Sequence, residues 1–95
     1  MQITTQELRH AVEVLLNYLE DTGHTVLTIE RDHYWWVSAD QRYDPHRQPN
    51  ELTLGQLTDD WAEITKIVTG ESAPIGYSLV WLSTILCAIG EDTAA

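Results

Sequence analysis

Apolar residues recur at helical spacing in the first twenty positions of the chain. They follow one another at steps of four, three and four, which places them on one face of a helix, and polar residues occupy the opposite face. Thr4-Thr5-Gln6-Glu7 has the pattern of a capping box, and Gly23 is a suitable C-terminal cap. The sequence therefore predicts an amphipathic helix between Thr4 and Gly23. Its apolar positions are Leu8, Val12, Leu15 and Leu19.

The pattern changes to that of an extended chain in the segment TVLTIERDHYWWVS, residues 25–38. β-Branched and aromatic residues are frequent, and apolar and polar side chains alternate. This predicts one strand, or two short strands broken at residues 31–32. Tyr34 and Trp36 would point to one face and Trp35 to the other. Because a lone strand or hairpin is marginal in water, we expect it to lie against the helices.

A second capping-box pattern, Ser38-Ala39-Asp40-Gln41, could open one helical turn, which Asp44-Pro45 would end. The next segment, HRQPN, has no apolar residue and two nearby prolines, so it is predicted to be a surface loop.

A third helix is predicted in LGQLTDDWAEITKIV and is closed by Gly70. Two starts are compatible with the sequence, a capping box from Thr53 to Gln56 or an N-terminus at Thr58. Trp61 is expected to be mostly buried, as is Trp36. The apolar stripe of this helix consists of Leu57, Trp61, Ile64 and Val68.

The most apolar stretch runs from Pro74 to Gly90. Ser72 could cap a helix there, with Pro74 in its first turn and Gly90 at its end. Apolar residues cover most of its sides, which is typical of a buried helix, and Cys87 would be a packed core thiol. The stretch is shorter than the ~20 residues that a bilayer requires. One face carries Leu79, Leu82, Leu86 and Ile89, and another carries Trp81 and Ile85.

These elements together predict a single domain, residues 1–95, of a mainly α (α+β) class. Three principal helices are expected, packed around the buried C-terminal helix, with a short strand or hairpin in the 25–38 region. A chain of 95 residues buries only about 60 to 65% of its unfolded surface, so its stability should be modest.

The net charge narrows the possible binding partners more than the rest of the composition does. The formal net charge is -10, with 15 acidic and 5 basic residues, which disfavours nucleic acid as a direct ligand. Such a field speeds the encounter with a basic partner, although it also simply keeps a small protein soluble. The N-terminus lacks the pattern of a signal peptide, so a cytoplasmic location is expected.

Few patterns indicate catalysis. The glycines stand singly, so no phosphate loop is predicted, and no known nucleophile or zinc-protease motif occurs. The four histidines lack metal-ligand spacing. We therefore expect no enzyme activity, cofactor or metal. A metal site in which Asp32, His33 and His46 meet is kept as an alternative.

Aromatic residues and carboxylates cluster between residues 32 and 44, and a second acidic group opens the third helix. Trp and Tyr are common in interface hot spots, and carboxylates around them suit a basic protein. The acidic group also has a structural reading, because it complements the helix dipole. The candidate partner-binding residues are Asp32, Tyr34, Trp35, Asp40, Tyr43, Asp44, Asp59, Asp60 and Glu63.

The segments YWWVSADQRYDP, ELTLGQLTDDW and PIGYSLVWLSTIL resemble a family of small acidic bacterial proteins. This family includes immunity proteins of contact-dependent growth inhibition and related polymorphic toxin systems. The resemblance covers most of residues 25–90 and implies a cytoplasmic protein that binds and blocks a cognate toxin domain, which would be basic if it is a nuclease. The resemblance does not identify which residues would contact the toxin. Two alternatives are a non-catalytic interaction or homo-oligomeric structural module, in which exposed Trp and Tyr would form a homodimer, and a small metal-binding enzyme. The protein is expected to be a monomer or a weak homodimer.

Overall fold

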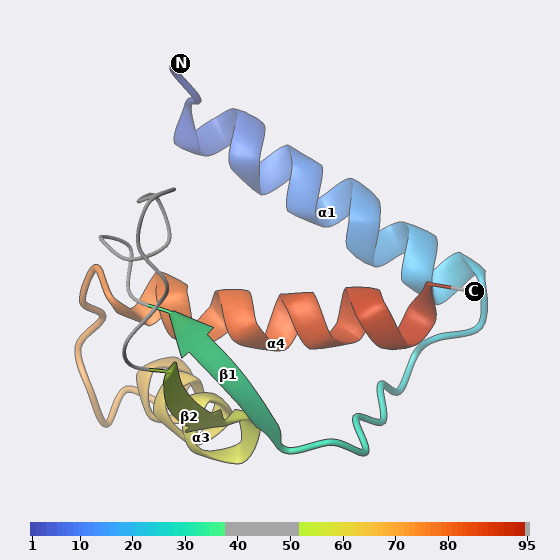
Figure 1. Cartoon of the computed structure of the whole chain (residues 1–95). Helices are drawn as coiled ribbons and strands as arrows, with labels where there is room; N and C mark the ends of the chain where they lie inside the picture. Colours follow the sequence, from blue (N-terminus) through green and yellow to red (C-terminus); the bar gives the residue numbers. More distant parts are fainter. Residues whose placement is uncertain (38–51, 95) are drawn as a thin grey trace.

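A computed structural model of the chain describes residues 1–37 and 52–94. Within these ranges the predicted class is confirmed, because three helices accompany one short antiparallel hairpin (Figure 1). The predicted turn and loop of residues 38–50 lie outside the described residues. The elements are α1 (Thr5–Asp21), β1 (His33–Val37), β2 (Leu52–Gln56), α3 (Leu57–Val68) and α4 (Ser78–Thr93).

The first helix begins and ends as its sequence predicts. Thr4 Oγ1 accepts a hydrogen bond from the Glu7 amide at 3.0 Å, and the Thr4 amide donates to Glu7 Oε1 at 3.3 Å. These two bonds form the capping box, which satisfies amides that the helix itself leaves unpaired. Gly23 follows the last turn with φ +91°, a conformation that favours glycine.

The hairpin is only half predicted. Its first strand, β1, lies in the expected region, but residues 27–32 form no strand. Its partner is β2, and Tyr34 pairs with Gly55 across the hairpin. The capping box proposed for Thr53 to Gln56 is therefore wrong, because these residues are part of a strand. The pairing partner is distant in sequence, so the local pattern contains no sign of it.

Helix α3 begins at Leu57, and Gln56, its N-cap residue, makes no capping hydrogen bond through its side chain. An N-terminus at Thr58 is therefore off by one residue. The buried stripe is rotated relative to the prediction, because Leu57 and Asp60 are buried whereas Trp61 is 52% exposed. The expected burial of Trp61 is wrong. The side chain of Trp36 lies outside the described set.

Helix α4 is shifted toward the C-terminus. The predicted start at Ser72 and Pro74 is wrong, since the helix begins at Ser78, and it continues through Gly90 to Thr93. Its buried residues are Ser78, Thr84, Ile85 and Ala88. Cys87 is exposed, so the predicted core thiol is wrong.

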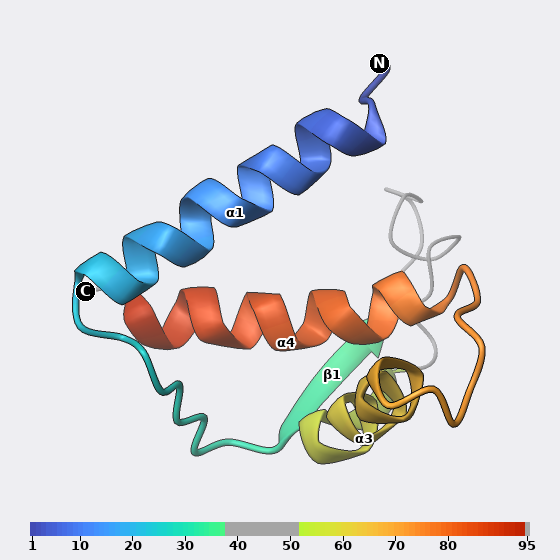
Figure 2. The ribbon, with the colours of Figure 1, turned by 180° about the vertical axis from the view of Figure 1, so that it is seen from behind.

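Helix α4 forms the middle layer of the molecule. Helix α1 lies on one side of it, and the hairpin and α3 lie on the other (Figures 1 and 2). The buried apolar residues among those described are Leu57, Ile85 and Ala88, at the contact of α3 with α4. By contrast, α1 has no buried residue, so the predicted packing of its apolar stripe is not observed. Among the described residues, no helix is long and apolar enough to cross a membrane.

Candidate functional site

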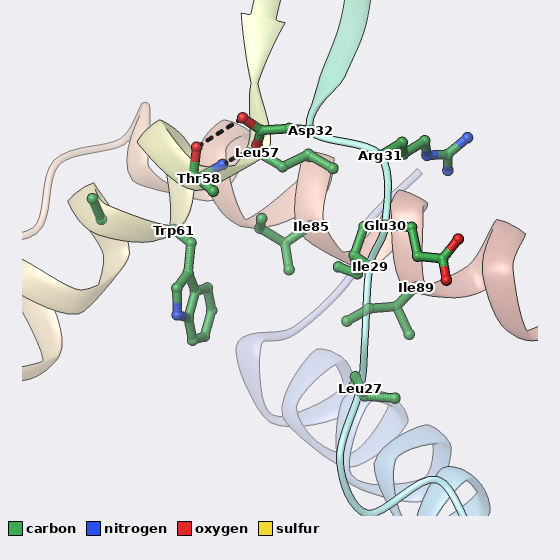
Figure 3. Close-up of a pocket in the computed structure, with 11 residues that line it drawn as sticks. Leu27, Ile29, Glu30, Arg31, Asp32, Leu57, Thr58, Trp61, Ile85 and Ile89 are labelled. Carbon is green, nitrogen blue, oxygen red and sulfur yellow. Dashed lines mark hydrogen bonds between the residues drawn. The ribbon is translucent and has the colours of Figure 1, made fainter.

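An open apolar groove lies between residues 27–32, the start of α3 and the middle of α4 (Figure 3). We call it the Trp61 groove. Its volume is about 660 Å³, and the indole of Trp61 stands at one side of it. The floor is aliphatic, and carboxylates lie only at the edge. The lining residues that carry the argument are Leu27, Ile29, Asp32, Trp61, Ile85 and Ile89.

Asp32 fixes one wall of this groove to α3. Its carboxylate accepts from the Thr58 amide at 2.8 Å and from the Thr58 hydroxyl at 3.0 Å, and its carbonyl accepts from the Leu57 amide at 2.7 Å. Asp32 therefore supplies the cap that Gln56 does not. The bond from the Thr58 amide is the main reason why the pKa of Asp32 is lowered, so the carboxylate stays charged.

The cation nearest the groove is already paired. The guanidinium of Arg31 lies 2.5 Å from Glu91 and 3.9 Å from Asp92, and it points away from Trp61 (Figure 3). This pairing lowers the pKa of Glu91. Because Arg31 is neutralised locally, the carboxylates of Glu30 and Asp32 determine the charge at the edge of the groove.

A second groove of about 640 Å³ lies between β1 and α4 and is lined by Tyr34 and Trp35. Trp35 is 66% exposed, as the alternation along β1 predicts. Cys87 also lines this groove, with its sulfur 3.4 Å from Glu91 Oε1. This hydrogen bond raises the pKa of the Cys87 thiol, which keeps the sulfur in its less nucleophilic form.

A buried carboxylate joins the hairpin to both packed helices. Asp60 is 8% exposed, and its Oδ2 lies 2.6 Å from the Tyr34 hydroxyl and 2.6 Å from the Thr84 hydroxyl. The Thr84 hydroxyl is also 2.8 Å from the Trp81 carbonyl, so its single proton is shared between two acceptors. We call Tyr34, Asp60 and Thr84 the polar junction.

The candidate partner-binding residues divide into four groups. Trp35 and Asp59 are exposed, whereas Asp32, Tyr34 and Asp60 hold the fold together through the bonds described above. Asp60 is therefore not available at the surface of this conformation. Glu63 is half-buried and pairs with Lys66 at 3.2 Å. Asp40, Tyr43 and Asp44 lie outside the described residues.

Trp61 is a surface residue that the sequence pattern places in the core. It continues the spacing of Leu57, but in the structure Asp60 occupies the buried side of the helix instead. The sequence does contain a signal for this arrangement. Leu57, Ile64 and Ile67 define an apolar face of the helix that includes Asp60 and excludes Trp61.

A metal site finds no support in residues 1–37 and 52–94, where no group of three His, Cys, Asp or Glu side chains could hold an ion. His33 Nε2 lies 3.2 Å from the side-chain nitrogen Nε2 of Gln56. His46, the third member of the alternative metal site, falls in the undescribed segment.

Comparison of the chain with protein-family models, with curated proteins and with solved structures found no match.

Proposed function

We propose that this protein is an immunity protein that binds and neutralises a cognate bacterial toxin domain in the cytoplasm. The observation that carries the proposal is the Trp61 groove, an exposed apolar surface with carboxylates at its edge, on a chain of net charge -10. The sequence resemblance to toxin-immunity proteins supports the same function.

The groove suits a protein partner better than a small polar ligand. The side chains of its floor, Leu27, Ile29 and Ile85, offer no hydrogen-bond partner, and Trp61 supplies the large, rigid contact area that is typical of interface hot spots. A partner would insert apolar side chains between Trp61 and α4 and would place basic residues near Glu30 and Asp32.

The negative charge and the apolar groove have different roles in binding. The negative field increases the association rate with a basic toxin, whereas burial of apolar side chains sets the dissociation rate. Fast capture followed by slow release is what an inhibitor of a lethal enzyme requires.

The test is co-expression of this protein with the toxin domain encoded beside its gene, with bacterial growth as the readout. Wild-type protein should restore growth, and Trp61→Ala should lose most of that protection. Val68→Ala is the matched control, because Val68 is exposed on the same helix but does not line the groove.

Equal protection by Trp61→Ala and Val68→Ala would remove the groove from the proposal. Unchanged killing in the presence of folded wild-type protein would reject the immunity function itself. Circular dichroism of each variant establishes that the protein tested is folded.

A further inference from the structure

Helix α1 exposes an apolar face that the rest of the described chain leaves uncovered. Leu15 is 63% exposed, and no residue of the helix is buried. The acidic residues Glu13 and Glu20 lie on the opposite face, so the apolar side is free of carboxylates that would oppose packing. The exposed apolar residues of α1 are Leu8, Val12, Val14, Leu15, Leu16 and Tyr18.

Helix α4 presents a second apolar strip toward α1. Leu79 is 68% exposed, and Leu86 is also exposed, because α4 packs on α3 through its other side. The two helices lie closest at their C-terminal ends and diverge toward the N-terminus of α1 (Figures 1 and 2). Between them is a gap of about 270 Å³, lined by residues such as Val12, Leu15 and Leu86.

We propose that a second copy of this chain covers this face. In the dimer, the α1 helix of each copy lies along the open side of the gap between α1 and α4 of the other, and the two α1 helices run antiparallel. The product is a four-helix arrangement built from α1 and α4 of both copies.

The spacing of the α1 stripe fits two-fold symmetry. An isologous interface requires a patch that is complementary to itself. The steps of four, three and four read the same in both directions, so an axis between Val12 and Leu15 pairs Leu8 with Leu19 and Val12 with Leu15 of the partner. The same register places Glu7 opposite Glu20 of the partner, but both carboxylates lie off the apolar stripe.

The exposed apolar side chains lie on the two elements that would form the interface. Leu15 and Leu16 of α1 are 63% and 42% exposed, and Leu79 and Leu86 of α4 are 68% and 41% exposed. A standard interface buries about 800 Å² of each partner, which these faces of α1 and α4 would supply together.

The test is the mass of the full-length protein in solution, measured by sedimentation from about 1 μM to about 1 mM. We expect a shift from 10.8 kDa to twice that value with increasing concentration. Leu15→Glu should shift the midpoint at least tenfold toward higher concentration. Asn17→Glu adds the same charge on the polar side of the same helix and should change the midpoint less than threefold.

A wild-type monomer over the whole range overturns the proposal, as does an equal effect of Leu15→Glu and Asn17→Glu. Circular dichroism shows whether each variant keeps its helices, and cross-linking tests the geometry independently of Leu15→Glu. In a Cys87→Ser background, a mixture of Leu8→Cys and Leu19→Cys proteins should form a mixed disulfide under mild oxidation. Absence of the mixed product, or self-linking of Leu8→Cys alone, rejects the antiparallel arrangement.

Failure of the dimer leaves the immunity proposal intact. The co-expression experiment depends on the Trp61 groove, which lies on the hairpin side of α4, whereas the mass of the free protein depends on α1 (Figure 1).

Discussion

Tyr34 links β1 to α3 through its side chain, because its hydroxyl donates to the buried carboxylate of Asp60. Partial burial and this hydrogen bond raise the pKa of Tyr34 to about 12. The folded protein therefore keeps the phenolic proton at pH values where the unfolded chain loses it. The resulting stabilisation is complete below the ordinary pKa of 10.0 and is lost as the pH rises from there to about 12.

Tyr34→Phe should lower the free energy of unfolding by about 0.5–1.5 kcal/mol at neutral pH, since Asp60 keeps its bond to Thr84. Urea denaturation measures the change. The difference between wild type and the variant should shrink between pH 10 and about 12. Tyr77→Phe, at an exposed tyrosine, is the control and should leave stability nearly unchanged. A pH-independent difference would contradict this account of Tyr34.

Gly55 is required for a reason that involves the same tyrosine. A Cβ atom at residue 55 would lie 2.2 Å from Cζ of Tyr34, so the ring could not remain over the strand. Gly55→Ala should destabilise the protein by about 1–3 kcal/mol, measured by thermal or urea unfolding. The control is Gly76→Ala, where an added Cβ meets open space. Similar stability of the two variants would show that the tyrosine ring can move aside at little cost.

At the scale of elements, α4 has one face that packs and one that does not. Ile85 is buried against α3, whereas Leu79 is largely exposed. Ile85→Ala should therefore cost about 2–5 kcal/mol, whereas Leu79→Ala in dilute protein should cost less than ~0.5 kcal/mol. Denaturant titration of both variants checks the difference. Equal costs would mean that the packing side of α4 is assigned wrongly.

The sequence predicts the helices and strands better than it predicts which face of each one is buried. Capping and periodicity are local, so α1 and the mainly helical class were found without the structure. The partner of β1 and the start of α4 depend on contacts between distant segments. The most apolar helix carries apolar residues on several sides, and periodicity alone does not show which side α3 covers.

For the candidate site, the sequence predicts the kinds of side chain present but not which residues form the groove. Acidity and aromatic exposure were expected, and Trp35 is exposed as predicted. The exposure of Trp61 is not predicted, because a tryptophan at helical spacing is normally a core residue. The burial of Asp60 is not predicted either, because nothing local marks the two hydroxyls that make it tolerable.

At the scale of the whole molecule, the net charge of -10 affects the two proposed associations in opposite ways. Added salt should weaken the capture of a basic toxin because it screens attraction. The same salt should strengthen the dimer because it screens repulsion between two acidic copies. Binding kinetics and sedimentation at a low and a high salt concentration measure the two trends. Weakening of the dimer by salt would indicate that its interface is held by ion pairs rather than by α1.

The isolation of α1 has a consequence for amide hydrogen exchange. A helix of 17 residues is only marginally stable in water without packing, and no side chain of α1 is fully buried in a single copy. Its amides should therefore exchange through local opening, well before those of α3 and α4, which require the core to separate. If a second copy covers α1, its protection will increase with protein concentration while that of α3 stays constant. The first helix then acts as a reporter of assembly within an otherwise unchanged fold.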